Sequence, residues 1–164
     1  MTRSHITIVS IALLVSVAIA FVSIPLASAH HGFQGRYDLS KPIWIEGTVV
    51  LSYFGNPHSV LTVEIANTLT EPEPRPDLGP AASFLDQNAL FAPVDLRGKT
   101  VQVELPPTSQ YSRLGGRIAT GDRIAVVAVR NCEPPHQLNA QWVRLADGSV
   151  ESRDAAMSYM VETC

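Results

Sequence analysis

The sequence predicts a mainly β fold: a small five-stranded OB-like barrel with a short helix, a proline-rich inserted loop and a C-terminal helical tail. Three observations support this prediction. Apolar and polar residues alternate along several short stretches, as expected of half-buried strands. Glycine and proline pairs separate these stretches, as turns do. The predicted elements follow the order strand, strand, strand, short helix, strand, strand, which is typical of an OB-like barrel.

Residues 1–29 have the features of a secretory signal peptide. Arg3 precedes an apolar run that extends from Ile6 to Ile24, and the small residues Ala27 and Ala29 have the spacing that signal peptidase requires. The apolar run is long, so an uncleaved N-terminal anchor is the alternative, and only in that case would the protein have a membrane partner. We expect cleavage after Ala29 and export, with the periplasm as the compartment.

Cleavage would leave 135 residues, which is enough for one domain with one core. We divide them into an N-terminal arm (30–41) and a single OB-like domain (42–164) that carries an insert (67–98). The mature chain has 11 Lys and Arg against 15 Asp and Glu. Recognition of a phosphate backbone needs clustered basic residues, so a nucleic-acid partner is not expected.

The first two strands are predicted on either side of a proline turn. Alternating residues at 43–51 surround Gly47, which predicts a strand with a bulge or bend at the glycine. Residues 53–58 contain Asn56 before a proline and form a turn, and 59–65 form the second strand. His58 is therefore expected at the rim of a hairpin.

The segment 67–98 interrupts the strand pattern. Residues 71–76 alternate glutamate or arginine with proline, which predicts a stiff, solvated segment. Residues 81–90 are compatible with a short helix. We expect an excursion with little core, acting as a surface linker or, in the alternative, as a docking segment.

Regular patterning resumes after the insert. Strands are predicted at 100–105, 123–130 and 138–145, with one or two helical turns at 108–114. The spacing of apolar residues in the tail, 152–162, suits a short amphipathic helix.

Cys132 and Cys164 are the two cysteines of the chain. In an oxidising compartment they most simply form one disulfide bond, which would pin Cys164 to the end of a strand. The alternative is a thiolate pair for a metal or for redox exchange, but the sequence contains no C-x-x-C motif.

A histidine cluster is the feature of the sequence that points most directly to chemistry. Cleavage after Ala29 would make His30 the first residue, so its α-amine and imidazole would lie beside His31. With His58 from the hairpin turn, these nitrogens would form a histidine brace, an arrangement that suits Cu(II). Asp38 and Asn56 are candidates to orient the ligands through hydrogen bonds. The alternative is an ordinary mobile N-terminus, with Asp38 as a turn residue.

The remaining candidate residues point to no reaction. Four aromatic residues could line a ligand face or fill the barrel, and for Trp142 we favour the core; they are Trp44, Tyr53, Phe54 and Trp142. His136 lies after two prolines and is expected to be exposed and uninvolved, and His5 belongs to the signal. The sequence has no nucleophile elbow, phosphate loop, paired catalytic carboxylates or haem motif, so we do not expect an enzyme.

Several of these segments together resemble a known family. The stretches His30–Phe33, Tyr37–Asp38, Lys41–Pro42, Glu46–Val49 and Asn56–His58 are similar to the pattern HHSF, YD, KP, GTV and NPH of small exported bacterial proteins of unknown function. The last third of the chain is similar more loosely. This chain departs from the pattern at Gly32, in the proline-rich insert and in its cysteines. The resemblance implies an exported, predominantly β domain and supplies no established activity.

Two functional hypotheses follow. The first is a periplasmic copper carrier or sensor that uses His30, His31 and His58. The second is a metal-free binding or scaffolding module that contacts a protein or small molecule through its barrel face or proline-rich loop. A copper oxidase is a third, weaker interpretation, because no substrate groove is evident from the sequence.

Overall fold

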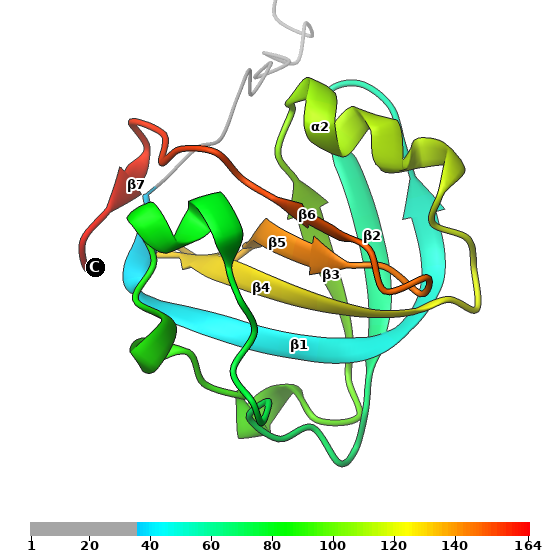
Figure 1. Cartoon of the computed structure of the whole chain (residues 1–164), viewed down its shortest axis with the longest axis horizontal. Helices are drawn as coiled ribbons and strands as arrows, with labels where there is room; N and C mark the ends of the chain where they lie inside the picture. Colours follow the sequence, from blue (N-terminus) through cyan, green and yellow to red (C-terminus); the bar gives the residue numbers. More distant parts are fainter. Residues whose placement is uncertain (1–35) are drawn as a thin grey trace, which may run out of the picture. The chain divides into compact units, whose positions relative to one another are not determined.

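Five strands close into a barrel in the computed structural model, which describes residues 36–164 (Figure 1). These residues belong to one compact unit. The strands are β1 (Tyr37–Tyr53), β2 (Ser59–Ile65), β3 (Thr100–Leu105), β4 (Arg123–Asn131) and β5 (Leu138–Arg144). They pair in the cyclic order β1, β2, β3, β5, β4 and back to β1. Only the β3–β5 pairing in this ring is parallel. The predicted mainly β, OB-like barrel is confirmed.

Short elements connect and cover the barrel strands. Helix α2 (Ser109–Ser112) continues into the 3-10 helix η4 (Arg113–Gly116) between β3 and β4, where the short helix was predicted. Thr108 accepts a hydrogen bond from the backbone N–H of Tyr111 and caps α2. The insert contains three 3-10 helices, which are η1 (Gly79–Ser83), η2 (Gln87–Ala89) and η3 (Val94–Leu96). The tail contains two short strands, which are β6 (Val150–Ser152) and β7 (Met160–Val161).

Strand β1 is longer than the sequence pattern indicated. It begins at Tyr37, so residues 37–41 belong to the sheet and not to the arm that we predicted at 30–41. Tyr37 pairs with Asn131 of β4 and with Met160 of β7. These partners are distant in sequence, so local alternation cannot reveal them.

Gly47 is required for close packing, and not for the bulge that we predicted there. It pairs with Ile65 on one side and with Ile124 on the other. A Cβ atom on Gly47 would lie 2.1 Å from the backbone oxygen of Glu64, which leaves no space for a side chain. The irregularity against β2 falls between Val49 and Leu51 instead.

The insert contributes to the core, contrary to the prediction of an excursion with little core. Its buried apolar residues are Leu69, Leu78, Ala81, Leu85 and Leu90. The hydroxyl of Ser152 holds the segment by donating to the backbone oxygen of Leu78. The indole N–H of Trp142 donates to the backbone oxygen of Asp77 at 3.0 Å. Apolar residues at 78–90 therefore pack on the barrel even though the preceding prolines cannot pair in a sheet.

The predicted helical tail is wrong. Ser152 of β6 pairs with Trp142 of β5, and the backbone N–H of Arg153 donates to the oxygen of Gln141. The oxygen of Tyr159 accepts from the N–H of Tyr37. Because neighbouring strands use these backbone groups, they cannot form the hydrogen bonds of a helix.

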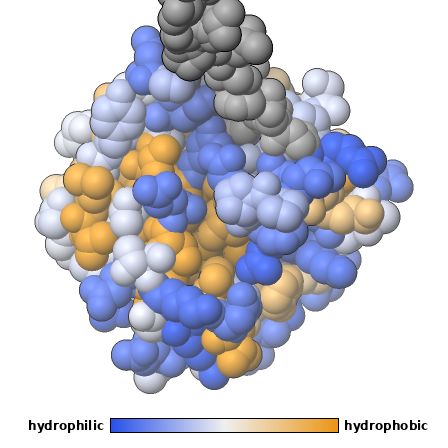
Figure 2. Space-filling view, turned by 180° about the vertical axis from the view of Figure 1, so that it is seen from behind, coloured by the Kyte–Doolittle hydropathy of each residue, from blue (hydrophilic) through white to orange (hydrophobic). Residues whose placement is uncertain are grey.

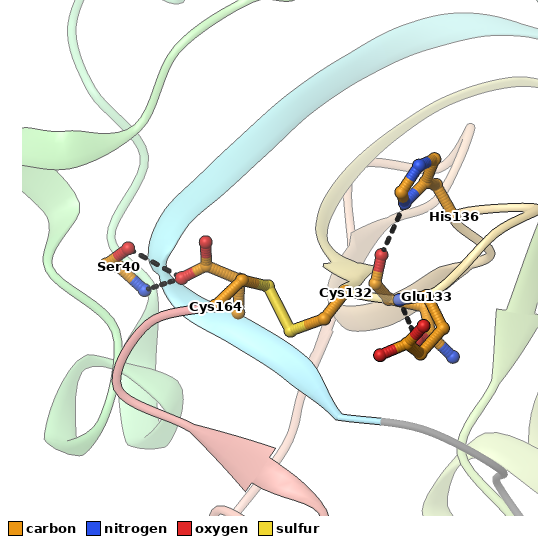
Figure 3. Close-up of a disulfide and its surroundings, with 7 residues drawn as sticks. Ser40, Cys132, Glu133, His136 and Cys164 are labelled. Carbon is orange, nitrogen blue, oxygen red and sulfur yellow. Dashed lines mark hydrogen bonds between the residues drawn. A yellow bond between two sulfur atoms is a disulfide. The ribbon is translucent and has the colours of Figure 1, made fainter.

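The disulfide prediction is confirmed. Cys132 and Cys164 are bonded, with Cα atoms 5.5 Å apart. Figure 3 shows this bond between Ser40 on one side and His136 on the other. The bond joins the tail to the end of β4, beside the loop that leads into β5.

The surface of residues 36–164 combines apolar and charged side chains. On the face drawn in Figure 2, apolar residues gather in a central band that hydrophilic residues frame. Large apolar side chains that are exposed include Leu51 and Tyr53, on the outer face of the β1–β2 hairpin. No helix within the described part of the chain is long and apolar enough to cross a membrane.

Candidate functional site

The predicted ligand His58 contacts a buried carboxylate. The turn of residues 54–58 places the Nδ1 atom of His58 at 2.7 Å from the Oε1 atom of Glu104, on β3. The His58 side chain is 22% exposed and that of Glu104 only 3%. Val60, two residues beyond His58, pairs directly with Glu104. This register explains the contact, because residues that are paired across two strands point to the same face.

Two further side chains join this pair. The Nε2 atom of Gln137, in the loop 132–137 before β5, donates to the Oε2 atom of Glu104 at 2.7 Å. The hydroxyl of Tyr37 donates to the Oε1 atom of Gln137 at 3.4 Å. We call His58, Glu104, Gln137 and Tyr37 the Glu104 cluster. It connects the turn 54–58, the loop 132–137 and the start of β1 through one carboxylate.

Burial changes the acidity of this cluster. It raises the pKa of Glu104 from an ordinary value of 4.5 to about 7, and the hydrogen bond from Gln137 partly opposes this effect. Burial, with a smaller effect from the Glu104 charge, raises the pKa of Tyr37 to about 12. A carboxyl group that is buried and titrates near neutrality is a common feature of functional sites.

The contact with Glu104 determines what His58 can do chemically. Above the pKa of Glu104 its carboxylate is ionised and only accepts hydrogen bonds, so the 2.7 Å contact favours the form of His58 that carries its proton on Nδ1. The lone pair of the neutral ring then lies on Nε2, the atom that can ligate a metal. Histidines that bind metals in proteins commonly donate their other N–H to a carboxylate in this way.

The other predicted site residues are dispersed. His30 and His31 lie outside the described residues. Asp38 is buried and accepts hydrogen bonds from the backbone N–H and the hydroxyl of Ser40, which is the behaviour of a turn residue. The backbone oxygen of Asn56 accepts from the hydroxyl of Tyr53 at 3.0 Å. Among residues 36–164, no group of three or more histidine, cysteine or acidic side chains has an arrangement that would hold a metal.

The aromatic candidates divide between core and surface. Trp44 and Trp142 are buried, with ring centroids 5.9 Å apart, so the core assignment of Trp142 is confirmed. Phe54 packs against the core. Tyr53 is 51% exposed and is therefore the one of the four that faces solvent most fully.

A cavity of about 690 Å³ lies beside the Glu104 cluster. Glu104 and Gln137 are part of its wall, and His136, with a left-handed backbone at φ 58°, lines it from the loop 132–137. The Nδ1 atom of His136 lies 3.0 Å from the backbone oxygen of Asn131. His136 is exposed, as predicted, but it adjoins the cavity.

Sequence reasoning did not identify Glu104 or Gln137. Glu104 lies 46 residues after His58, in a strand whose alternation predicts an outward, solvated position. The register of β3 on β2 could have indicated the contact, because an outward residue near the end of β3 lies beside the turn 54–58 that precedes β2. Gln137 precedes β5 and has no distinguishing local pattern.

The turn with His58 lies within a segment that matches a family model. Residues 16–74 match a family of unknown function (DUF6152). This match includes β1 and β2 and agrees with the resemblance noted in the sequence. The match supports the resemblance to a family of unknown function, but it does not test the individual motifs. No curated protein matches the chain.

The fold has a distant likeness among solved structures. One of them is a crystal structure of TiaS in complex with tRNA and ATP, which is 12% identical over the matched part, with a TM-score of 0.39. The match covers 68% of this chain and 19% of that chain.

Proposed function

We propose that the protein is an exported, periplasmic β-barrel protein that binds one copper ion through the mature N-terminus and His58. The ligands are the α-amine and imidazole of His30 and the Nε2 atom of His58, and His31 is a substitute ligand. The role is metal carriage or sensing. The contact between Nδ1 of His58 and the buried Glu104 carboxylate carries this proposal, because an ionised carboxylate there favours the proton on the nitrogen that does not ligate.

The reach of the N-terminal residues supports the proposal. Arg36 lies six positions after His30, and an extended segment of that length spans up to ~20 Å. The path from Tyr37 to His58 passes through Gln137 and Glu104 alone. Four side chains joined by such contacts cover on the order of 15–20 Å. The segment is therefore long enough for His30 to meet His58.

The chemistry of the donors fits Cu(II). Amine and imidazole nitrogens in a planar arrangement favour Cu(II), which also heads the affinity order of the divalent metals. The ligand nitrogens must be deprotonated, so affinity is expected to fall steeply below about pH 6.5. Copper on His58 would also favour the ionised form of Glu104 and lower its pKa from about 7.

The test is a Cu(II) titration of the protein that begins at His30. Mass spectrometry of the secreted protein first establishes this terminus. Calorimetry and electron paramagnetic resonance then compare it with His58→Ala and with a form whose N-terminal α-amine is acetylated. We expect an affinity loss of at least about tenfold in both, together with a changed nitrogen hyperfine pattern, because each variant lacks one of the proposed nitrogen ligands. His136→Ala is the matched control, because His136 is exposed and outside the ligand set.

Equal copper affinity in all four proteins would exclude the site. A second comparison addresses Glu104 alone. In Glu104→Gln the new amide can donate to Nδ1 of His58, which would move the ring proton to Nε2. We expect about 10- to 100-fold weaker copper binding in this variant. Unchanged affinity would mean that the contact with Glu104 does not prepare His58 for a metal.

A further inference from the structure

The barrel opens between β3 and β5. These strands pair at only two positions, Val103 with Leu138 and Glu104 with Asn139. Before these positions, residues 100–102 of β3 pair with β2 on one side. On the other side, Val101 and Gln102 line a cavity of about 690 Å³ whose opposite wall contains the loop residues 135–137. We call this cavity the β3 groove.

Residues 100–102 of β3 have no strand from the described region paired with them on the groove side. In an antiparallel pair, successive residues direct their N–H and C=O groups alternately toward and away from the partner. The N–H of Ile65 donates to the oxygen of Lys99, so Thr100 and Gln102 are the residues that direct their backbone groups away from β2, and Gln102 lines the groove. Pro135 on the opposite wall has no N–H to offer them. An open strand edge of this kind is a template for another extended chain.

The walls of the groove combine an apolar floor with a cation. The apolar residues that line it are Val60, Leu96, Val101 and Leu138. Arg130 lies at the rim, and its Nη2 atom is 3.9 Å from the nearest oxygen of Asp95, which is too long for a hydrogen bond. Its guanidinium can therefore still form a bidentate pair with a carboxylate. Glu104, the buried acid in the wall, is already held by His58 and Gln137.

We propose that the β3 groove binds an extended peptide segment, which adds to the edge of β3 as a further strand. An apolar side chain of the peptide occupies the floor, and an acidic side chain that follows it pairs with Arg130. The backbone of such a peptide pairs with the edge of β3, while its side chains contact the apolar floor and Arg130. This mode of binding is called strand addition. The volume lies within the range of ligand pockets. This site needs no metal and is independent of the proposed copper function.

The probe for this proposal is the peptide acetyl-Thr-Val-Thr-Val-Asp-amide. Titration into the nitrogen-15-labelled protein in the presence of EDTA is followed by amide chemical shifts and hydrogen exchange. We expect slowed exchange at residues 100–102 and shifts at the groove residues, including 101–102, 136–138 and Arg130, with a dissociation constant below about 1 mM. The absence of these shifts at millimolar peptide would overturn the proposal.

Two modified peptides separate strand addition from other binding. A peptide methylated on its backbone nitrogens cannot donate to β3, so we expect binding to weaken at least about tenfold. A peptide with lysine in place of aspartate should also bind more weakly. Equal binding of the methylated peptide would refute strand addition. Sedimentation tests whether a second copy of the chain occupies the groove. A dimer formed through the edge of β3 would prevent the peptide-induced shifts and would refute the peptide proposal.

Protein variants test the role of Arg130, and a chelator tests the independence from copper. Arg130→Gln should weaken binding of the aspartate peptide about fivefold and leave binding of an asparagine peptide unchanged. Arg123→Gln is the matched control, because Arg123 is exposed at the other end of β4. Binding measured in EDTA tests the independence from copper, because the chelator removes the metal without changing any residue of the groove. Equal effects of the Arg130 and Arg123 variants would refute the assigned contact.

Discussion

Replacement of Glu104 by glutamine is expected to change how stability depends on pH. Burial raises the pKa of Glu104 from 4.5 to about 7 in the folded protein, so between these values the folded state binds a proton that the unfolded state has released. Stability therefore falls as pH rises from 4.5 to 7 and is level above that range. At 1.36 kcal/mol for each pKa unit, the loss is about 3 kcal/mol.

Glutamine has nearly the same shape as glutamate but does not ionise, so Glu104→Gln should abolish this part of the pH dependence. Urea unfolding from pH 4 to 8, followed by circular dichroism, measures the free energy of unfolding in both proteins. The variant should gain up to about 3 kcal/mol relative to the wild type on going from pH 4 to pH 8. Parallel curves would refute the claim that Glu104 is a buried carboxyl with a raised pKa. Glu133→Gln, the same change at an exposed position, is the control.

Two other substitutions test the fold. Replacing Cys132 and Cys164 with serine removes a cross-link between residues 32 apart, and thermal unfolding should show a loss of about 3–4 kcal/mol; an unchanged midpoint would contradict a stabilising role. Gly47→Ala places a Cβ 2.1 Å from the oxygen of Glu64, so a loss of at least about 3 kcal/mol is expected. Gly116→Ala, where a Cβ meets nothing within 4 Å, should change stability by less than about 0.5 kcal/mol, and equal effects of the two glycine variants would refute the packing argument.

The strands were predictable from the sequence because alternation is a local property. Residues 100–105 form β3 with the predicted bounds, and β2 likewise occupies 59–65. The tail could not be predicted in this way. Its apolar spacing suits a helix, but pairing with Gln141 and Tyr37 in distant strands uses its backbone. Tertiary pairing therefore decided the outcome where local preference was weak.

The candidate site was only half predictable for the same reason. His58 was identified because an Asn-Pro-His turn is visible in the sequence. Glu104 and Gln137 become its neighbours only through the register of β2 on β3 and the path of the loop 132–137. A composition or a motif contains no information about that register. The proposed ligands His30 and His31 stay a prediction that the described residues do not test.

The long first strand has a consequence for the order of folding. Of the barrel strands, β1 pairs with both β2 and β4, and its residues 43–48 join residues 123–128. A chain that is made from its N-terminus can form the β1–β2 hairpin early, but the other edge of β1 waits until about 80 further residues have followed. During that interval, an apolar strand edge is open to wrong partners. We therefore expect the nascent protein to depend on protection by a chaperone until β4 arrives.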